Sequence, residues 1–118
     1  MIVEITQHGW VGLLFALLIG HALADYALQT SFISKAKCPC FWEGKGTQWN
    51  WVVVLAAHSL IHAGMVWIVT GMMWIALAEL TLHFMIDKLK CDERFGFRTD
   101  QGLHVLCKAM FVVVIFVF

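Results

Sequence analysis

The chain has 118 residues, of which 61% are hydrophobic and 14% charged, and its eight basic residues balance its eight acidic ones. Soluble domains contain about 45–50% apolar residues, and a chain this small could not bury the excess. The composition excludes a disordered chain, a secreted disulfide scaffold and an ordinary soluble enzyme, and the balanced charge offers no basic field for nucleic acid. It indicates a protein that has the lipid bilayer as its main partner.

Four apolar segments follow one another, at residues 10–28, 51–69, 72–89 and 102–118. Each approaches the ~20 residues that a helix needs to cross the hydrocarbon core. Residues 51–82 are too long for one crossing, and Thr70-Gly71 is the break that we expect within them. We therefore predict an all-α fold, with residues 1–118 forming a single domain, an integral membrane bundle of four transmembrane helices.

Two polar segments, residues 29–50 and 88–101, hold seven of the eight basic residues. With four spans both segments lie on one side of the membrane. Basic loops favour the cytoplasm, so we expect both loops there and both termini outside. Cys38, Cys40 and Cys91 would then be free thiols, because the cytoplasm keeps cysteines reduced.

Each apolar segment carries or begins with one pair of ionisable residues spaced i, i+4. The pairs are His21 with Asp25, His58 with His62, His83 with Asp87, and Asp100 with His104. This spacing places both members on one helix face, and the expected topology puts all four pairs at one depth. One turn deeper, Glu79 and Lys108 share a level. We expect them to pair, because an isolated charge costs several kcal/mol in hydrocarbon.

Imidazole and carboxylate groups together suit zinc, manganese or iron, and we expect zinc first. Facing helices of a bundle can supply such ligands to one site. The candidate ligands are His21, Asp25, His58, His62, His83, Asp87 and His104. They exceed one tetrahedral site, which indicates one or two ions. Any single pair is more often an interhelical hydrogen bond than a ligand set.

Other polar residues near the pairs have supporting or catalytic roles in this interpretation. Asp25, Asp100 and Glu79 are the candidate acids and bases. Gln29 lies one turn beyond Asp25 and either orients a ligand or caps the helix. Gln101 and Lys108 complete the candidate site.

Three functions fit these residues. The first is a metal-dependent hydrolase that acts on a lipid or another amphiphile, because the site opens near the membrane interface. The second is an oligomeric transporter or channel for protons, metal ions or small solutes, because intramembrane ionisable residues also mark relays. The third is a non-enzymatic accessory protein of the membrane, in which the pairs hold helices together.

Four stretches of the chain resemble the domain-of-unknown-function 3307 family: GHALADYALQTSFISKAK, LAAHSLIHA, LHFMIDKLK and TDQGLHVL. They contain the elements H-x-x-x-D, H-x-x-x-H, H-x-x-x-D and D-Q-x-x-H in that order, and the resemblance extends from His21 to Leu106. The family consists of small multi-pass membrane proteins of bacteria and their phages, with no established activity. The resemblance implies a bacterial inner membrane location, including the host membrane for a phage-encoded chain. A looser likeness links the pairs to membrane proteins described as metal-dependent hydrolases.

Overall fold

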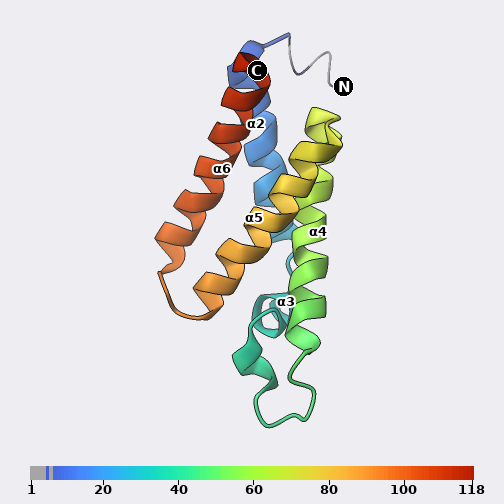
Figure 1. Ribbon diagram of the computed structural model, residues 1–118, viewed down its shortest axis with the longest axis vertical. Coiled ribbons are helices and arrows are strands. Elements are labelled where there is room, and N and C mark those ends of the chain that lie inside the picture. The colour runs from blue at the N-terminus through green and yellow to red at the C-terminus, as the bar shows by residue number, and fades with distance from the viewer. Residues whose placement is uncertain (1–4, 6) are drawn as a thin grey trace.

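The computed structural model describes residues 5 and 7–118, and four long helices make up most of them (Figure 1). They are α2 (Gly9–Ala22), which continues into the π-helical turn η1 (Leu23–Ala27), α4 (Asn50–Thr70), α5 (Met73–Cys91) and α6 (Phe97–Val117). Helices α2 and α5 each contact both α4 and α6, so the four close into a ring. The resulting bundle is elongated, at 52 × 24 × 23 Å.

The turn between α4 and α5 lies where the sequence predicts it. Gly71 adopts φ of 68°, and its N–H donates to Trp67 O at 2.7 Å, which ends α4. A left-handed residue after a helix is typically glycine, since a Cβ is strained there. The long apolar stretch therefore folds as a helical hairpin, as expected.

The two polar connections lie at the opposite end of the bundle from this turn (Figure 1). Residues 29–50 include two short elements, α3 (Ser31–Ala36) and the 3-10 turn η2 (Pro39–Trp42). The Thr30 hydroxyl caps α3 by accepting from Ile33 N at 3.2 Å. The second connection is shorter than the expected 88–101, because α5 continues to Cys91 and α6 begins at Phe97.

Three of the four long helices are long and apolar enough to cross a membrane. These are Gly9–Ala27, Asn50–Thr70 and Phe97–Val117. The predicted fourth span, residues 72–89, corresponds to α5 (Met73–Cys91), which is long enough but by composition is not among them, so three of the four predicted spans meet this criterion. The reason is its charge, since α5 carries Glu79, Asp87, Lys88 and Lys90.

The interior of the bundle is unusually polar. Among the described residues, thirteen buried side chains are polar or charged and twelve are hydrophobic, while large apolar side chains such as Phe15, Leu60 and Val113 are exposed. An apolar core formed around Leu13, Leu17, Val66, Ile75 and Phe111 holds the helices together. Buried ionisable side chains occupy much of the remaining interior and are called the polar cluster below: His21, Asp25, Lys37, His58, His62, Glu79, His83, Asp87, Asp100, His104 and Lys108. This distribution suits a bundle surrounded by lipid.

Candidate metal centre

Asp25 enters the bundle from the widened turn η1. Leu28 N donates to Leu23 O at 2.8 Å, an i to i−5 bond that makes this turn π-helical. π-helical turns are rare in proteins, and those that do occur are often found at functional sites. Gly20 allows α2 to pack closely against α4 just before this turn, since a Cβ at this position would lie 3.2 Å from Met65 Cβ.

The Asp25 carboxylate gathers side chains from three helices. Its Oδ1 accepts from His62 Nε2 at 2.9 Å and lies 3.3 Å from His58 Nε2. Its Oδ2 accepts from Gln101 Nε2 at 2.9 Å and lies 3.4 Å from His21 Nε2. Helices α2, α4 and α6 thus converge on one buried carboxylate.

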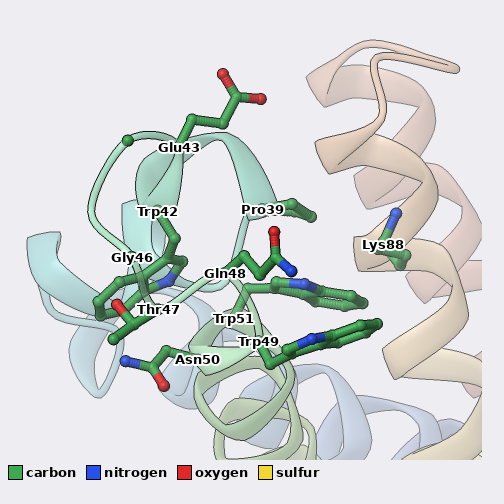
Figure 2. Close-up of a pocket in the computed structure, with 11 residues that line it drawn as sticks. Pro39, Trp42, Glu43, Gly46, Thr47, Gln48, Trp49, Asn50, Trp51 and Lys88 are labelled. Atoms are coloured by element: carbon green, nitrogen blue, oxygen red, sulfur yellow. The ribbon is translucent and has the colours of Figure 1, made fainter.

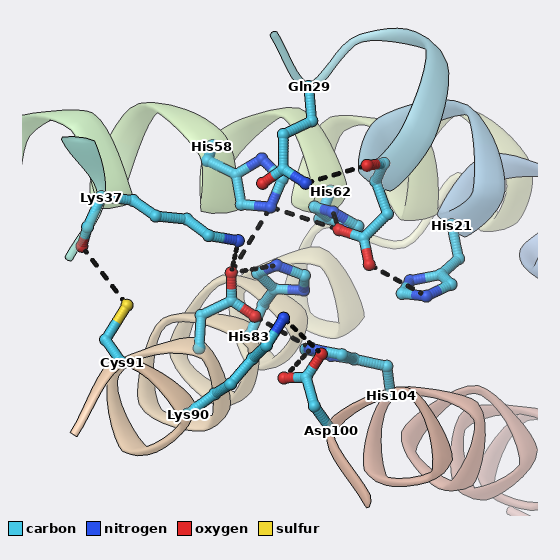
Figure 3. Close-up of polar contacts among 12 residues, drawn as sticks. His21, Gln29, Lys37, His58, His62, His83, Lys90, Cys91, Asp100 and His104 are labelled. Atoms are coloured by element: carbon cyan, nitrogen blue, oxygen red, sulfur yellow. Dashed lines mark hydrogen bonds and ion pairs between the residues drawn. The ribbon is translucent and has the colours of Figure 1, made fainter. Parts of the chain in front are cut away.

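Asp87, on α5, forms a second centre of contacts. Its Oδ1 accepts from His104 Nε2 at 3.0 Å, and its Oδ2 accepts from Lys37 Nζ at 2.6 Å. The Nε2 atoms of His58 and His83 each lie 3.5 Å from the same Oδ2. His58 Nε2 therefore lies between the carboxylates of Asp25 and Asp87. Figure 3 shows the His58 ring beside those of His62 and His83.

The predicted ion pair between Glu79 and Lys108 is confirmed. Lys108 Nζ donates to Glu79 Oε1 at 2.6 Å, and both residues are 1% exposed. Glu79 Oε1 also lies 3.4 Å from His83 Nδ1. The His83 ring stacks on His62 and on His104, with centroids 3.6 Å and 4.2 Å away. Glu79 thus helps to set the orientation of a central imidazole.

Two groups of ligand atoms are close enough to hold a metal ion. Within each group, one atom from every residue lies within 4.8 Å of the others; the groups are Asp25, His58, His62 and His83, and then His83, Asp87 and His104. All these residues are buried. The ring nitrogens of His58 and His83 and Nδ1 of His62 have no hydrogen-bond partner in the part of the chain that the structure describes. Metal coordination is one way to satisfy such atoms, so the residues fit an ion.

The charges inside the cluster are unbalanced. Four buried carboxylates, those of Asp25, Glu79, Asp87 and Asp100, face two buried ammonium groups, those of Lys37 and Lys108. Lys90, which is partly exposed, lies 3.7 Å from Asp100 and offsets part of this excess. With neutral imidazoles a net negative charge remains, and buried charge needs compensation in a medium of low dielectric, which a bound cation would supply.

A family model described as a protein of unknown function, DUF3307, matches residues 13–118. The chain belongs to this family. No curated protein and no solved structure matches it. The resemblance expected from the paired motifs is therefore confirmed, and the paired motifs of this DUF3307 chain lie together in space.

Two predicted residues of the DUF3307 chain lie beside the ligand groups. His21 contacts Asp25 and donates from Nε2 to Gln101 Oε1 at 3.1 Å, but it belongs to neither group. Asp100 Oδ1 lies 3.4 Å from His104 Nε2 and accepts no hydrogen bond from the residues that the structure describes. Gln29 caps the helix end, because its Nε2 donates to the backbone carbonyl of Asp25 at 2.9 Å.

Two lysines that the sequence places in loops belong to the cluster or contact it instead. Lys37 is 5% exposed and contacts Asp87, and Lys90 Nζ lies 3.7 Å from Asp100 Oδ2. Lys90 follows Asp87 by one turn of α5, so helical spacing could have found it. For Lys37 the sequence carries no such signal, since fifty positions separate it from its partner.

The expectation of free thiols is wrong for two cysteines. Cys38 and Cys91 form a disulfide that joins the two polar connections. Cys40 and Cys107 are free, the first exposed and the second buried. The spacing of C-P-C gave no reason to pair Cys38 with a residue so far along the chain.

A surface hollow of about 1050 Å³ lies among the residues between η2 and α4 (Figure 2). Its walls include Trp42, Trp49 and Trp51, together with Lys88. No residue of the two ligand groups lines it, so it is separate from the candidate metal centre. Indole rings are typical of the membrane interface.

Proposed function

We propose that the chain is a membrane-embedded, metal-dependent hydrolase whose metal, zinc by preference, would be held by Asp25, His58 and His62, with the fourth position left open for a water. The observation that carries this proposal is the meeting of one carboxylate and three imidazoles within 4.8 Å inside the bundle. Two imidazole nitrogens and one carboxylate oxygen are a donor set of catalytic zinc sites. The excess of carboxylates over ammonium groups in the cluster adds to the attraction for a divalent ion.

In this proposal α5 is the fourth helix within the membrane. Helix α4 is apolar enough to cross, and the Cys38–Cys91 bond joins the connection that precedes α4 to the last residue of α5. Two residues on opposite sides of a bilayer could not be bonded, so α5 must return across it. Its Glu79 and Asp87 face the buried cluster, which is where charged residues of membrane helices are tolerated.

The bound ion would supply a Lewis acid and an activated water at neutral pH. Asp100 is the general base in this proposal, since its buried Oδ1 accepts no hydrogen bond within the described residues and lies 3.4 Å from His104 Nε2. It would take the proton of the attacking water and return it to the leaving alcohol. Glu79 is less suited, because it is held by Lys108.

The substrate in this proposal is an ester of an amphiphile. Exposed Tyr26 donates to half-buried Gln101 at 3.4 Å, which brings the cluster to the surface beside η1 and α6. A lipid-like molecule could approach there from the bilayer, with its polar group towards the centre. Transport is less favoured, because the apolar core around Leu17 and Phe111 interrupts the polar cluster before the other end of the bundle.

Metal analysis of the purified protein tests the centre. After equilibration with zinc, manganese or iron, we expect about one ion per chain. His62→Ala should lose the ion, whereas His8→Ala, at an exposed histidine outside the cluster, should keep it. Metal well below one ion per chain, or full metal in His62→Ala, would contradict the proposal.

Hydrolysis is tested separately. Wild-type protein in lipid nanodiscs should cleave ester-linked amphiphiles, and Asp100→Asn should retain the ion but lose most of this activity, by about 100-fold or more. If the ion is present but no ester is cleaved, the centre stands and hydrolysis is rejected. Proton or metal-ion flux into liposomes that is lost with Asp25→Asn would instead favour transport.

A further inference from the structure

Lys37 brings a positive charge into the cluster from outside the four long helices. It is the residue that ends α3, and it lies almost wholly buried, at 5% exposure. Its ammonium donates to Asp87 Oδ2 at 2.6 Å, and Figure 3 shows it reaching between α4 and α5. A lysine in a polar loop is ordinarily exposed to solvent, and lysines are rarely buried unless they pair with an opposite charge, as Lys37 does with Asp87.

The ammonium group lies on a carboxylate that could otherwise hold a metal. Asp87 is the only carboxylate of the group His83, Asp87 and His104. An ammonium in contact with this carboxylate repels a divalent cation and occupies one of the oxygen's positions. The first group can bind its ion without Asp87, because Asp25, His58 and His62 supply three ligands without His83 or Asp87.

The backbone of Lys37 is fixed to the helix that carries Asp87. The next residue, Cys38, is bonded to Cys91, which lies one turn beyond Asp87 on α5. Cys91 Sγ lies 3.8 Å from Lys37 O, so the bond holds the lysine backbone against the end of this helix. Without the bond, α3 and its lysine would depend on weaker contacts.

We propose that Lys37 takes the place of a second cation at Asp87, and that the Cys38–Cys91 disulfide keeps it there. With both features present the cluster holds one divalent ion. Loss of the lysine charge, or of the bond, opens the group His83, Asp87 and His104 to a second ion. This inference rests on the proposed metal centre and assigns the residue that limits its capacity.

The test measures zinc per chain in the purified protein at saturating zinc. Wild type should hold about one ion and Lys37→Met about two, because removal of the ammonium frees Asp87. Lys37→Arg, which keeps the charge, should stay at about one. Lys45→Met is the matched control, since Lys45 is exposed and lies over the half-buried Phe41 ring, outside the cluster.

The disulfide is tested independently of the lysine. Cys38→Ser with Cys91→Ser should also raise zinc towards about two ions, while Cys40→Ser, at an exposed free cysteine, should not. This pair of variants decides the question if Lys37→Met fails to fold. Asp87→Asn added to either variant should return zinc to about one ion, which locates the second ion.

The outcomes separate this inference from the proposed function. Zinc absent from the wild type rejects the metal centre itself. One ion in the wild type with no increase in Lys37→Met and in the serine variants overturns the role of Lys37. Two ions in the wild type also overturn it, because the ammonium would then not exclude the second ion.

Discussion

The side-chain amide of Gln101 links the carboxylates of Asp25 and Asp100. Its Nε2 donates to Asp25 Oδ2 at 2.9 Å and to Asp100 Oδ2 at 3.1 Å. Its Oε1 accepts from His21 and from the Tyr26 hydroxyl. An amide whose donors and acceptor are all engaged fixes the carboxylates that it contacts. Residues of this kind tune a metal site without binding the ion.

We therefore expect Gln101→Ala to weaken metal binding. Loss of the amide frees Asp25 to turn away from the histidines, and the affinity should fall by about 10- to 100-fold. Competition with a chromophoric chelator measures it. Gln29→Ala is the control, because Gln29 donates to the Asp25 backbone and not to its carboxylate, so its loss should leave the affinity unchanged. Equal affinities for both variants would reject the orienting role of Gln101.

The ion pair of Glu79 and Lys108 makes a prediction for stability. Lys108→Met leaves a buried carboxylate without its ammonium, so the free energy of unfolding should fall by about 3–5 kcal/mol. The double variant Glu79→Leu with Lys108→Met removes both charges and should recover most of this loss. Unfolding in mixed micelles with increasing SDS measures both. A single variant as stable as wild type would show that the pair contributes little.

The residues of the cluster were predictable where spacing along one helix carried the information. Pairs at i, i+4 in apolar segments located the histidines and aspartates, and matching depth located Glu79 opposite Lys108. Contacts between distant segments carried no such signal. Lys37 and the Cys38–Cys91 bond were missed for this reason, and both bear on how many cations the cluster could bind.

At the scale of elements, hydropathy predicted the four helices within a few residues. It did not show that the composition of α5 differs from that of the other three helices, since Glu79, Asp87, Lys88 and Lys90 leave α5 outside the helices that are apolar enough to cross a membrane by composition alone. The π-helical turn η1 was also missed. The pattern of His21 and Asp25 was interpreted with regular helical spacing, and no residue type in Leu23–Ala27 specifies an i to i−5 bond.

The turn that ends α4 gives a prediction at this scale. Gly71→Ala places a Cβ at φ of 68° and should destabilise the protein by about 1–2 kcal/mol. Gly64→Ala, within the same helix and with no atom near the added Cβ, should instead be neutral or stabilising by up to ~1 kcal/mol. Thermal unfolding in detergent compares the two. A similar effect of both substitutions would argue against the left-handed turn.

At the scale of the whole molecule, an apolar exterior surrounds a polar interior, which reverses the arrangement of a soluble bundle. The membrane crossing of α5 is then the decisive point of topology. In a Cys40→Ser background, single cysteines at Thr47, Glu93 and Met73 report the side of each connection to a membrane-impermeant maleimide. We expect Thr47→Cys and Glu93→Cys to be labelled from one side, the cytoplasmic one by the basic-residue rule, and Met73→Cys from the other. Labelling of Thr47→Cys and Glu93→Cys from opposite sides would reject the fourth crossing.

The disulfide links this topology to the redox state of a compartment. Disulfides persist in oxidising compartments and are reduced in the cytoplasm, whereas the basic residues of the same two connections favour the cytoplasm. A chain inserted with these connections outwards would keep Lys37 fixed on Asp87, and a chain inserted the other way would release it. The direction of insertion, which is set during synthesis, would thus determine how many metal ions the same side chains can hold.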